Sequence, residues 1–132
     1  MKTITVVVVN WNRAEMLREC LQSLEIQVNG EGGRWPLEVI VVDNGSTDRT
    51  AEMADAMAAA DPRVRVVHHP ANRKLGGSMK TGYANATGDL ILYSDADLPF
   101  DMHDVHKAIR LLRYYDADIV SAYRFDRTGE GY

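Results

Sequence analysis

The chain has 132 residues, of which 45% are hydrophobic and 26% are charged. These values are ordinary for one globular domain, and they exclude disordered, collagen-like and fibrous proteins. The 15 Lys and Arg residues against 19 Asp and Glu residues give a net charge of -4. We therefore expect no nucleic-acid partner, because contacts to phosphates require the opposite balance.

The sequence also indicates where the chain works. Its longest apolar run, Ile4 to Val9, is interrupted by Thr5 and is far shorter than the roughly 18 residues that cross a bilayer. The single cysteine, Cys20, cannot form an internal disulfide, which fits a reducing compartment. No cleavage site typical of a signal peptide follows the N-terminus. We expect a water-soluble, cytoplasmic chain in which Cys20 packs on or beside the apolar stripe of the first helix.

Strands and helices are predicted to alternate along the chain. The β-branched run at 4–9 does not alternate with polar residues, which is typical of a strand buried on both faces. Leu17, Leu21 and Leu24 then recur at helical spacing. The predicted strands span 4–9, 37–42, 64–67, 90–93 and 118–123. Two predicted helices span 14–27 and 77–86. Another begins at a cap, Thr47 or Asp48, and ends at about 60, and the last begins at a cap, Asp101, and ends at about 115.

This order of elements predicts an α/β fold. Strands that alternate with helices form a mostly parallel sheet with right-handed crossovers and with helices on both faces. The last nine residues, 124–132, are polar and lack periodicity. We therefore expect the chain to stop inside a loop.

Polar side chains are concentrated where the predicted strands end. Asn10 to Asn12, Asp43 to Ser46, and the pair Asp95 and Asp97 all occupy such positions, and ligands of open parallel sheets bind beyond the carboxyl ends of the strands. Asp and Asn also favour turns and helix caps. That explanation suits Asp95 and Asp97 poorly, because two like charges this close repel unless a cation or ligand lies between them.

Several common phosphate sites are excluded. The first glycine is Gly30, well beyond the first strand, so the G-x-G-x-x-G fingerprint of dinucleotide-binding proteins is absent. Neither G-x-x-x-x-G-K-[ST] nor G-x-S-x-G occurs. A diphosphate would then be bound by a metal on the Asp pair, and carboxylate oxygens suit Mg²⁺ or Mn²⁺.

Four motifs in order resemble the family 2 glycosyltransferases. They are Val6 to Asn12, Val41 to Asp48, Asn72 with Gly76, Gly82 and Gly88-Asp89, and Ser94 to Asp97. An Asp-x-Asp pair alone would be a weak signal, whereas four motifs in the right order are specific. The resemblance extends from the first strand to the last residue, and it implies a Rossmann-like GT-A fold and transfer of a sugar from a nucleoside-diphosphate sugar.

Two segments point to different branches of that family. Asp95 to Pro99, with Ala117 to Arg124, is similar to the polyprenyl-phosphate (dolichol-phosphate type) enzymes. Val9 to Arg13 is instead similar to other members, including rhamnosyltransferase-like ones. The implied acceptor is a polyprenyl phosphate or a saccharide, and the implied location is the cytoplasm, with a peripheral position at the cytoplasmic membrane face for a lipid acceptor.

The resemblance also implies roles for individual residues. Asp43 would bind the base or ribose, Asp95 the ribose or a metal-bound water, and Asp97 the Mg²⁺ or Mn²⁺ that bridges the donor phosphates. Arg124 would hold a phosphate of the donor or acceptor, although a salt bridge to Asp126 or Glu130 is equally plausible. The implied catalytic residues are Asp95, Asp97 and Arg124, and the implied metal ligands are Asp95 and Asp97. The implied nucleotide-sugar-binding residues are Val9, Trp11, Asn12, Asp43, Gly45, Lys74, Gly76 and Asp95.

Some residues have two open interpretations. Trp11 lies against the base or ribose, or it is a buried aromatic at a strand end. Arg73, Lys74 and Lys80 form an anion site near a helix start, or they are a solvated basic stretch. The four histidines form no cluster with a cysteine, so we expect them to be structural or exposed.

The family inverts the sugar by direct displacement, and it carries the catalytic base in the half that follows the Asp-x-Asp motif. The chain ends soon after Asp97. We therefore expect residues 1–132 to form a single nucleotide-sugar-binding domain, truncated before the acceptor half, whose exposed strand edge favours a homo-oligomer. The alternative is a non-catalytic nucleotide-binding fragment or regulatory module of such an enzyme.

Overall fold

The computed structural model describes residues 3–29, 36–95 and 102–122, and it divides into two compact units, residues 1–100 and 101–132. The first unit contains β1 (Ile4–Asn10), α1 (Ala14–Asn29), β2 (Leu37–Asp43), α2 (Thr50–Ala60), β3 (Val64–His68), α3 (Lys74–Asn85) and β4 (Leu90–Asp95). The second unit contains α4 (Met102–Tyr114). No helix in the described ranges has the length and apolarity needed to cross a membrane.

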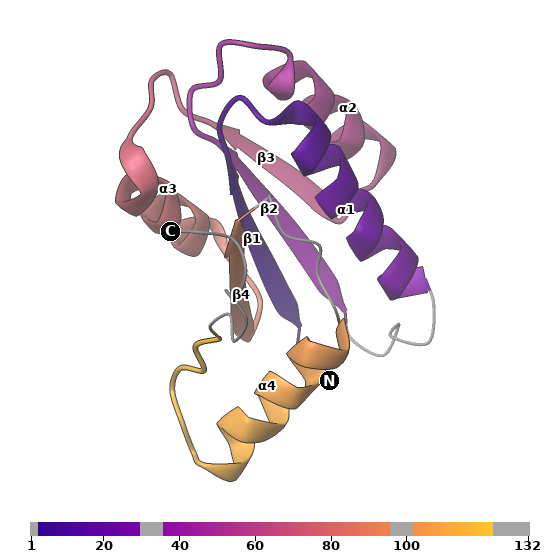
Figure 1. Ribbon diagram of the computed structural model, residues 1–132, viewed down its shortest axis with the longest axis vertical. Coiled ribbons are helices and arrows are strands. Elements are labelled where there is room, and N and C mark those ends of the chain that lie inside the picture. Colours follow the sequence, from indigo (N-terminus) through magenta and orange to yellow (C-terminus); the bar gives the residue numbers. More distant parts are fainter. Residues whose placement is uncertain (1–2, 30–35, 96–101, 123–132) are drawn as a thin grey trace, which may run out of the picture. The chain divides into compact units, whose positions relative to one another are not determined.

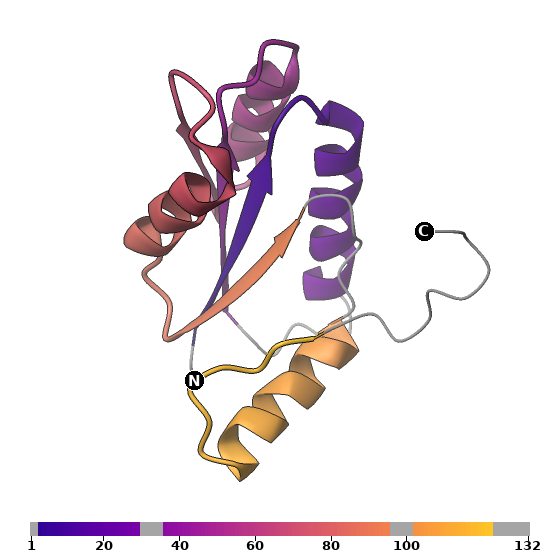
Figure 2. The ribbon, with the colours of Figure 1, turned by 60° about the vertical axis from the view of Figure 1, so that its left-hand side comes forward.

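The four strands of the first unit form one parallel sheet. Their order is β3-β2-β1-β4, and every neighbouring pair is parallel. Helices α1 and α2 lie on one face and α3 lies on the other (Figures 1 and 2). The predicted α/β fold, with a parallel sheet and helices on both faces, is confirmed.

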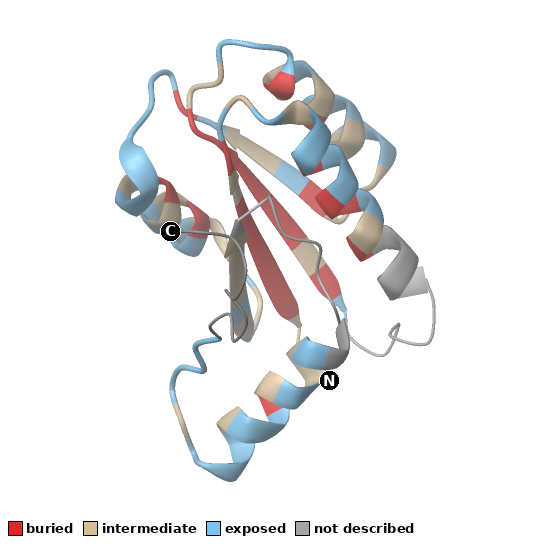
Figure 3. Cartoon of the chain, in the orientation of Figure 1, coloured by how far each residue is buried: buried red, intermediate tan, exposed pale blue. Residues whose placement is uncertain are grey.

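The core consists of the two central strands and the helices against them. In Figure 3, β1 and β2 are buried along most of their length. Val6, Val7 and Val8 are all fully buried, which explains why β1 lacks the alternation of a strand with one wet face. Cys20 is 2% exposed, and its predicted packing role is confirmed.

The fifth predicted strand, 118–123, is wrong over its described part. Residues 118–122 form no strand, and Ile119 is 81% exposed. A β-branched sequence favours an extended backbone, but a strand exists only where a neighbour satisfies its N-H and C=O groups. The described residues of the second unit contain no strand that could pair with this segment.

The starts of two helices also differ from the predictions. Helix α3 begins at Lys74 rather than at 77 and therefore includes Gly76 and Gly77. Helix α2 begins at Thr50, and the Asp48 carboxylate accepts the backbone N-H of Thr50 at 2.9 Å, so Asp48 still supports the first turn. The predicted cap at Asp101 lies outside the described residues.

A polar cluster around Glu38 joins the amino ends of the strands. Its carboxylate accepts the Thr5 hydroxyl at 2.6 Å and the Thr87 backbone N-H at 3.0 Å, and it pairs with Arg65. Burial raises the pKa of Glu38, but hydrogen bonds from Thr5, Thr87 and Arg65 outweigh that effect and lower it to about 2. The carboxylate therefore stays ionised at neutral pH and ties β1, β2, β3 and the α3–β4 loop together.

Helix α3 approaches β1 closely at one glycine. A Cβ added at Gly82 would lie 2.3 Å from Cγ1 of Val7, whereas a Cβ added at Gly76 would meet nothing within 4 Å. Gly82 therefore sets the spacing between α3 and the sheet, and Gly76 does not.

These two glycines of one helix give a matched pair of substitutions. We expect Gly82→Ala to lower the free energy of unfolding by about 1 to 3 kcal/mol, because the new methyl group overpacks against Val7. We expect Gly76→Ala to raise it by about 0.5 to 1 kcal/mol, because alanine restricts the unfolded chain and favours the helix. Urea unfolding followed by circular dichroism measures both. Equal effects of the two substitutions would contradict the packing described for α3.

Candidate functional site

The strand register aligns polar residues at the carboxyl edge of the sheet. Asn10 pairs with Asp43, and Asp43 pairs with His68, so that three strands end in one row. On the other side of β1, Asp95 pairs with Val9. The chain order reverses between β1 and β4, and this switch point is where open parallel sheets bind ligands. The strand ends that the sequence predicted as a site therefore share one edge.

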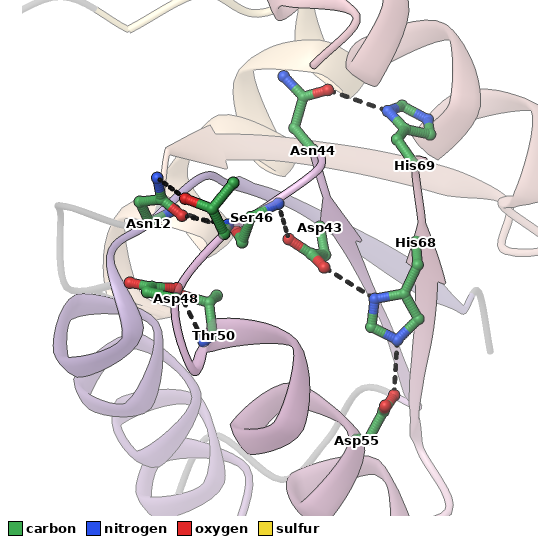
Figure 4. Close-up of polar contacts among 10 residues, drawn as sticks. Asn12, Asp43, Asn44, Ser46, Asp48, Thr50, Asp55, His68 and His69 are labelled. Atoms are coloured by element: carbon green, nitrogen blue, oxygen red, sulfur yellow. Dashed lines mark hydrogen bonds and ion pairs between the residues drawn. The ribbon is translucent and has the colours of Figure 1, made fainter. Parts of the chain in front are cut away.

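The loops after β1 and β2 are linked through Asn12. Its backbone N-H donates to Oγ of Ser46 at 3.1 Å, and its Oδ1 accepts the backbone N-H of Thr47 at 2.8 Å (Figure 4). Asn12 has φ 51°, a left-handed conformation that Asn tolerates better than most residues. The side chain of Asn12 thus has a structural role in fixing the two loops.

Trp11 is presented at the surface beside this link. Trp11 is 50% exposed, so the alternative of a buried aromatic is wrong. An exposed indole at a strand end offers a flat apolar surface on which a base or sugar ring can stack.

Asp43 at the end of β2 is an enclosed acidic side chain. Only 4% of its side chain is exposed. Its Oδ1 accepts the backbone N-H of Ser46 at 3.1 Å, and its Oδ2 lies 2.8 Å from Nδ1 of His68. A buried carboxylate needs such donors, since an unpaired one is costly to remove from water.

His68 bridges Asp43 to helix α2. Its Nε2 lies 2.7 Å from Oδ1 of Asp55, and 39% of its side chain is exposed. Hydrogen bonds with Asp43 and then Asp55 raise the pKa of His68, against the opposing effect of burial. This contact was not predicted from the sequence. The sequence signal that could have indicated it is that Asp43 and His68 each lie at the end of a strand, and that these two strands are neighbours in the sheet.

A second polar network holds the loop before α3. Asn44 donates from Nδ2 to Oδ1 of Asn72 at 3.1 Å, and its Oδ1 accepts the backbone N-H of Arg73 at 2.9 Å. The same Oδ1 lies 3.0 Å from Nδ1 of His69, and Nε2 of His69 lies 2.8 Å from Oγ1 of Thr81. Burial lowers the pKa of His69, and the nearby charge of Arg73 adds to the effect. His69 is therefore a neutral, structural histidine, as predicted.

Gly45 and Gly76 differ in what the structure requires of them. Gly45 has φ 77°, and an added Cβ would lie 2.6 Å from the carbonyl carbon of Ala71. Only glycine suits this conformation and this close approach of two loops. No such constraint acts on Gly76, so packing does not explain a glycine there.

The basic residues near the start of α3 are exposed. Arg73, Lys74 and Lys80 all face solvent in part or in full. Lys74 has φ 62°, and its backbone N-H donates to Oδ1 of Asn72 at 2.7 Å. The left-handed conformation strains the backbone at Lys74, because a residue with a Cβ clashes there. The side chain of Lys74 is exposed, so that its amino group can reach an anion. Both earlier interpretations of this stretch stay open.

The remaining predicted site residues are only partly described. Asp95 is the last residue of β4, and its backbone aligns with Val9. Asp97 and Arg124 lie outside the described residues. Among the residues that are described, no three His, Cys, Asp or Glu side chains are arranged to hold a metal ion, so the metal-binding roles of Asp95 and Asp97 stay predictions.

The parallel sheet, its helices and the polar carboxyl edge define the class of protein, an α/β domain of the Rossmann-like type. A family model described as "Glycosyl transferase family 2" matches residues 5–132. The chain belongs to this family.

Curated relatives are longer than this chain. It is 36% identical over 95 residues to "Glycosyltransferase AglD" of Haloferax volcanii, covering 70% of the chain and 15% of the relative. It is 30% identical over 127 residues to "Glycosyltransferase GlyG" of Streptococcus pneumoniae, covering 95% of the chain and 40% of the relative. It is 31% identical over 130 residues to an undecaprenyl-phosphate 4-deoxy-4-formamido-L-arabinose transferase of Pectobacterium carotovorum, covering 96% and 38%. The chain thus spans 15% to 40% of these relatives.

Solved structures share the fold. Mannosyltransferase PcManGT of Pyrobaculum calidifontis, in complex with GDP-Man and Mn²⁺, is 27% identical with a TM-score of 0.72, over 84% of this chain and 32% of that one. TarS (1-349) of S. aureus is 22% identical with a TM-score of 0.75, over 98% and 38%. The likeness to TarS concerns the fold alone.

Substitutions at Lys74 separate its backbone strain from its charge. We expect Lys74→Gly to raise the free energy of unfolding by about 1 kcal/mol relative to Lys74→Ala, because glycine adopts the left-handed conformation without a Cβ clash. If the amino group binds an anion, both variants lose the same fraction of affinity for a nucleoside diphosphate. Thermal unfolding and calorimetry measure the two effects. Full affinity in both variants would leave Lys74 as part of a solvated stretch.

Proposed function

We propose that residues 1–132 form the donor-binding part of an inverting family 2 glycosyltransferase, which transfers a sugar from a nucleoside-diphosphate sugar to an acceptor. The observation that carries this proposal is the carboxyl edge of the sheet. There Asp43 is fixed by Ser46 and His68, and Trp11 is exposed on the neighbouring strand end. An enclosed acceptor group beside an open aromatic surface suits the hydroxyl or N-H groups of a nucleoside.

In this proposal the nucleoside of the donor binds at the carboxyl edge of the sheet. Asp43 accepts hydrogen bonds from the base or ribose, and Trp11 stacks on a ring. The likeness to PcManGT, whose structure contains GDP-Man and Mn²⁺, supports a nucleoside-diphosphate sugar as the ligand. Lys74 and Gly76, at the start of α3, line the diphosphate side.

Asp95 and Asp97 are proposed to hold Mg²⁺ or Mn²⁺. Both offer carboxylate oxygens, the ligands that these hard cations prefer. The backbone of Asp95 ends β4 beside Val9 of β1, which places it at the same edge of the sheet as Asp43. A bound cation would neutralise negative charge on the departing nucleoside diphosphate.

The proposed acceptor is a polyprenyl phosphate, with a saccharide as the other candidate. Two similar proteins are named as an undecaprenyl-phosphate arabinose-derivative transferase and a dolichyl-phosphate beta-glucosyltransferase. A phosphate acceptor is already ionised at neutral pH, so its attack needs no general base. Arg124 is proposed to hold that phosphate, and the enzyme would work in the cytoplasm at the inner face of the membrane.

Two substitutions test the two ends of the proposed donor site. We expect Asp43→Ala to weaken binding of UMP or GMP and of UDP or GDP by at least about tenfold, because hydrogen bonds to a charged group contribute about 1.5 to 3 kcal/mol. We expect Asp97→Asn to leave monophosphate binding unchanged and to remove the increase in diphosphate affinity that Mn²⁺ provides. Isothermal titration calorimetry with Mn²⁺ and with EDTA measures all of these affinities.

The same titrations show where the proposal fails. A wild-type chain that binds no nucleotide of either base would contradict the proposed function. An Asp97→Asn variant with unchanged diphosphate affinity in Mn²⁺ would remove only the metal assignment. Nucleotide binding without transfer of radiolabelled sugar to polyprenyl phosphate would favour the non-catalytic module.

A further inference from the structure

His68 lies between two carboxylates from different elements. Its Nδ1 is 2.8 Å from Oδ2 of Asp43 at the end of β2, and its Nε2 is 2.7 Å from Oδ1 of Asp55 on α2. Figure 4 shows the ring in line with both carboxylates. Both ring nitrogens face acceptors, and an imidazole serves two acceptors only when it carries two protons.

Solvent exposure of the side chains increases from Asp43 through His68 to Asp55. The Asp43 side chain is 4% exposed, His68 is 39% exposed and Asp55 is 63% exposed. The triad therefore extends from an enclosed carboxylate to the surface. Asp55 is well hydrated, so its contact with His68 orients the ring more than it stabilises the fold.

Among the described residues, two charged side chains pair with His68. Strand β2 contributes Asp43 and helix α2 contributes Asp55, while Arg65 on β3 itself is engaged with Glu38. Two negative groups with no competing described cation in contact favour the doubly protonated ring. The raised pKa of His68 agrees with this arrangement.

We propose that His68, oriented by Asp55, is a positioning residue that fixes the Asp43 carboxylate for recognition of the nucleoside end of a nucleotide. The inference rests on the proposed donor site, and it adds two residues that no motif in the sequence singled out. Ser46 N-H fixes Oδ1 of Asp43 and His68 fixes Oδ2. Among the described residues, each oxygen accepts one of these contacts and keeps a second lone pair for a ligand, and the two contacts determine where those lone pairs point.

Loss of one proton from His68 weakens this arrangement. The neutral ring has one N-H, and it can no longer donate to both carboxylates. Since the pKa of His68 is raised, the doubly protonated form predominates below the ordinary value of about 6.5 and persists above it. Nucleotide affinity should therefore be highest on the acid side and fall as the pH rises through the raised pKa.

Two amide substitutions at His68 separate the contact of Nδ1 with Asp43 from the contact of Nε2 with Asp55. Asparagine places a neutral N-H₂ group near the position of Nδ1, where it can still donate to Asp43. Glutamine places that group near the position of Nε2, toward Asp55. With UMP and GMP as probes in EDTA at pH 6.5, we expect His68→Gln to raise the Kd about tenfold and His68→Asn to raise it by less than about threefold.

The pH profile gives a readout that a merely structural role would not change. Between pH 6 and pH 9, the Kd of the wild-type chain should rise by about threefold relative to that of His68→Asn, which has no titrating ring. This ratio cancels the titration of the probe itself. In Asp55→Asn the rise should begin at a lower pH, because one carboxylate that favours the charged ring is gone.

An NMR measurement on the free wild-type chain tests the same claim without a ligand. Imidazole ¹⁵N shifts should show both nitrogens of His68 protonated at pH 6.5, with a titration above the ordinary value. A flat affinity ratio, equal Kd values for the two amide variants, or titration of His68 below 6.5 would each overturn the positioning role. Those results leave the proposed function intact if the wild-type chain binds nucleotide, whereas failure of the wild-type chain to bind UMP, GMP and their diphosphates overturns both.

Discussion

The carboxylate of Asp43 is the constraint on which the edge of the sheet depends. The strand that carries it is buried on both faces, and the side chain is 4% exposed. A carboxylate in that position requires hydrogen-bond donors, because neither water nor an apolar neighbour replaces them. The donors come from the next loop, through Ser46, and from the next strand, through His68. Satisfying one side chain therefore fixes two neighbouring segments.

The rest of the edge is assembled in a similar way. Asn12 joins the loops after β1 and β2, and Asn44 joins the end of β2 to the loop before α3. The backbone of the loop before α3 lies so close to Gly45 that a Cβ at this position would clash with it. Many nucleotide-binding folds fix phosphates with a glycine-rich loop after β1. Here amide and hydroxyl side chains arrange the loops, and the fixed framework reduces the entropy lost when a ligand binds.

The sequence predicted the four strands of the sheet well, but it failed for the segment 118–122 and for the start of α3, for physical reasons. The first two strands were placed to within a residue at each end, because burial on both faces requires a continuous β-branched run. The segment 118–122 contains only two β-branched residues, Ile119 and Val120, and it forms no strand, since short apolar stretches do not by themselves supply a hydrogen-bonding neighbour. The start of α3 was missed because Gly76 and Gly77 have low helix propensity, and the Asn44 network stabilises that turn through contacts distant in sequence.

The candidate site follows the same division. Clustering of Trp11, Asn12, Asp43 and the end of β4 at one edge was predictable, because parallel strands end on the same side of a sheet. The pairing of His68 with Asp43 depends on register between strands that are distant in the chain, and no local pattern encodes it. Asp97 and Arg124 remain predictions from the family resemblance.

We propose that the carboxyl edge of the sheet, and no other surface, binds the nucleoside of a nucleotide. Amide chemical-shift mapping of the ¹⁵N-labelled 132-residue chain with UDP and GDP in Mg²⁺ tests it most directly. We expect shifts at Trp11, Asn12, Asn44 and His69 for at least one of the nucleotides, with Thr5, Glu38 and Thr87 at the opposite edge unchanged. Shifts centred on the Glu38 edge, or none at millimolar nucleotide, would contradict it.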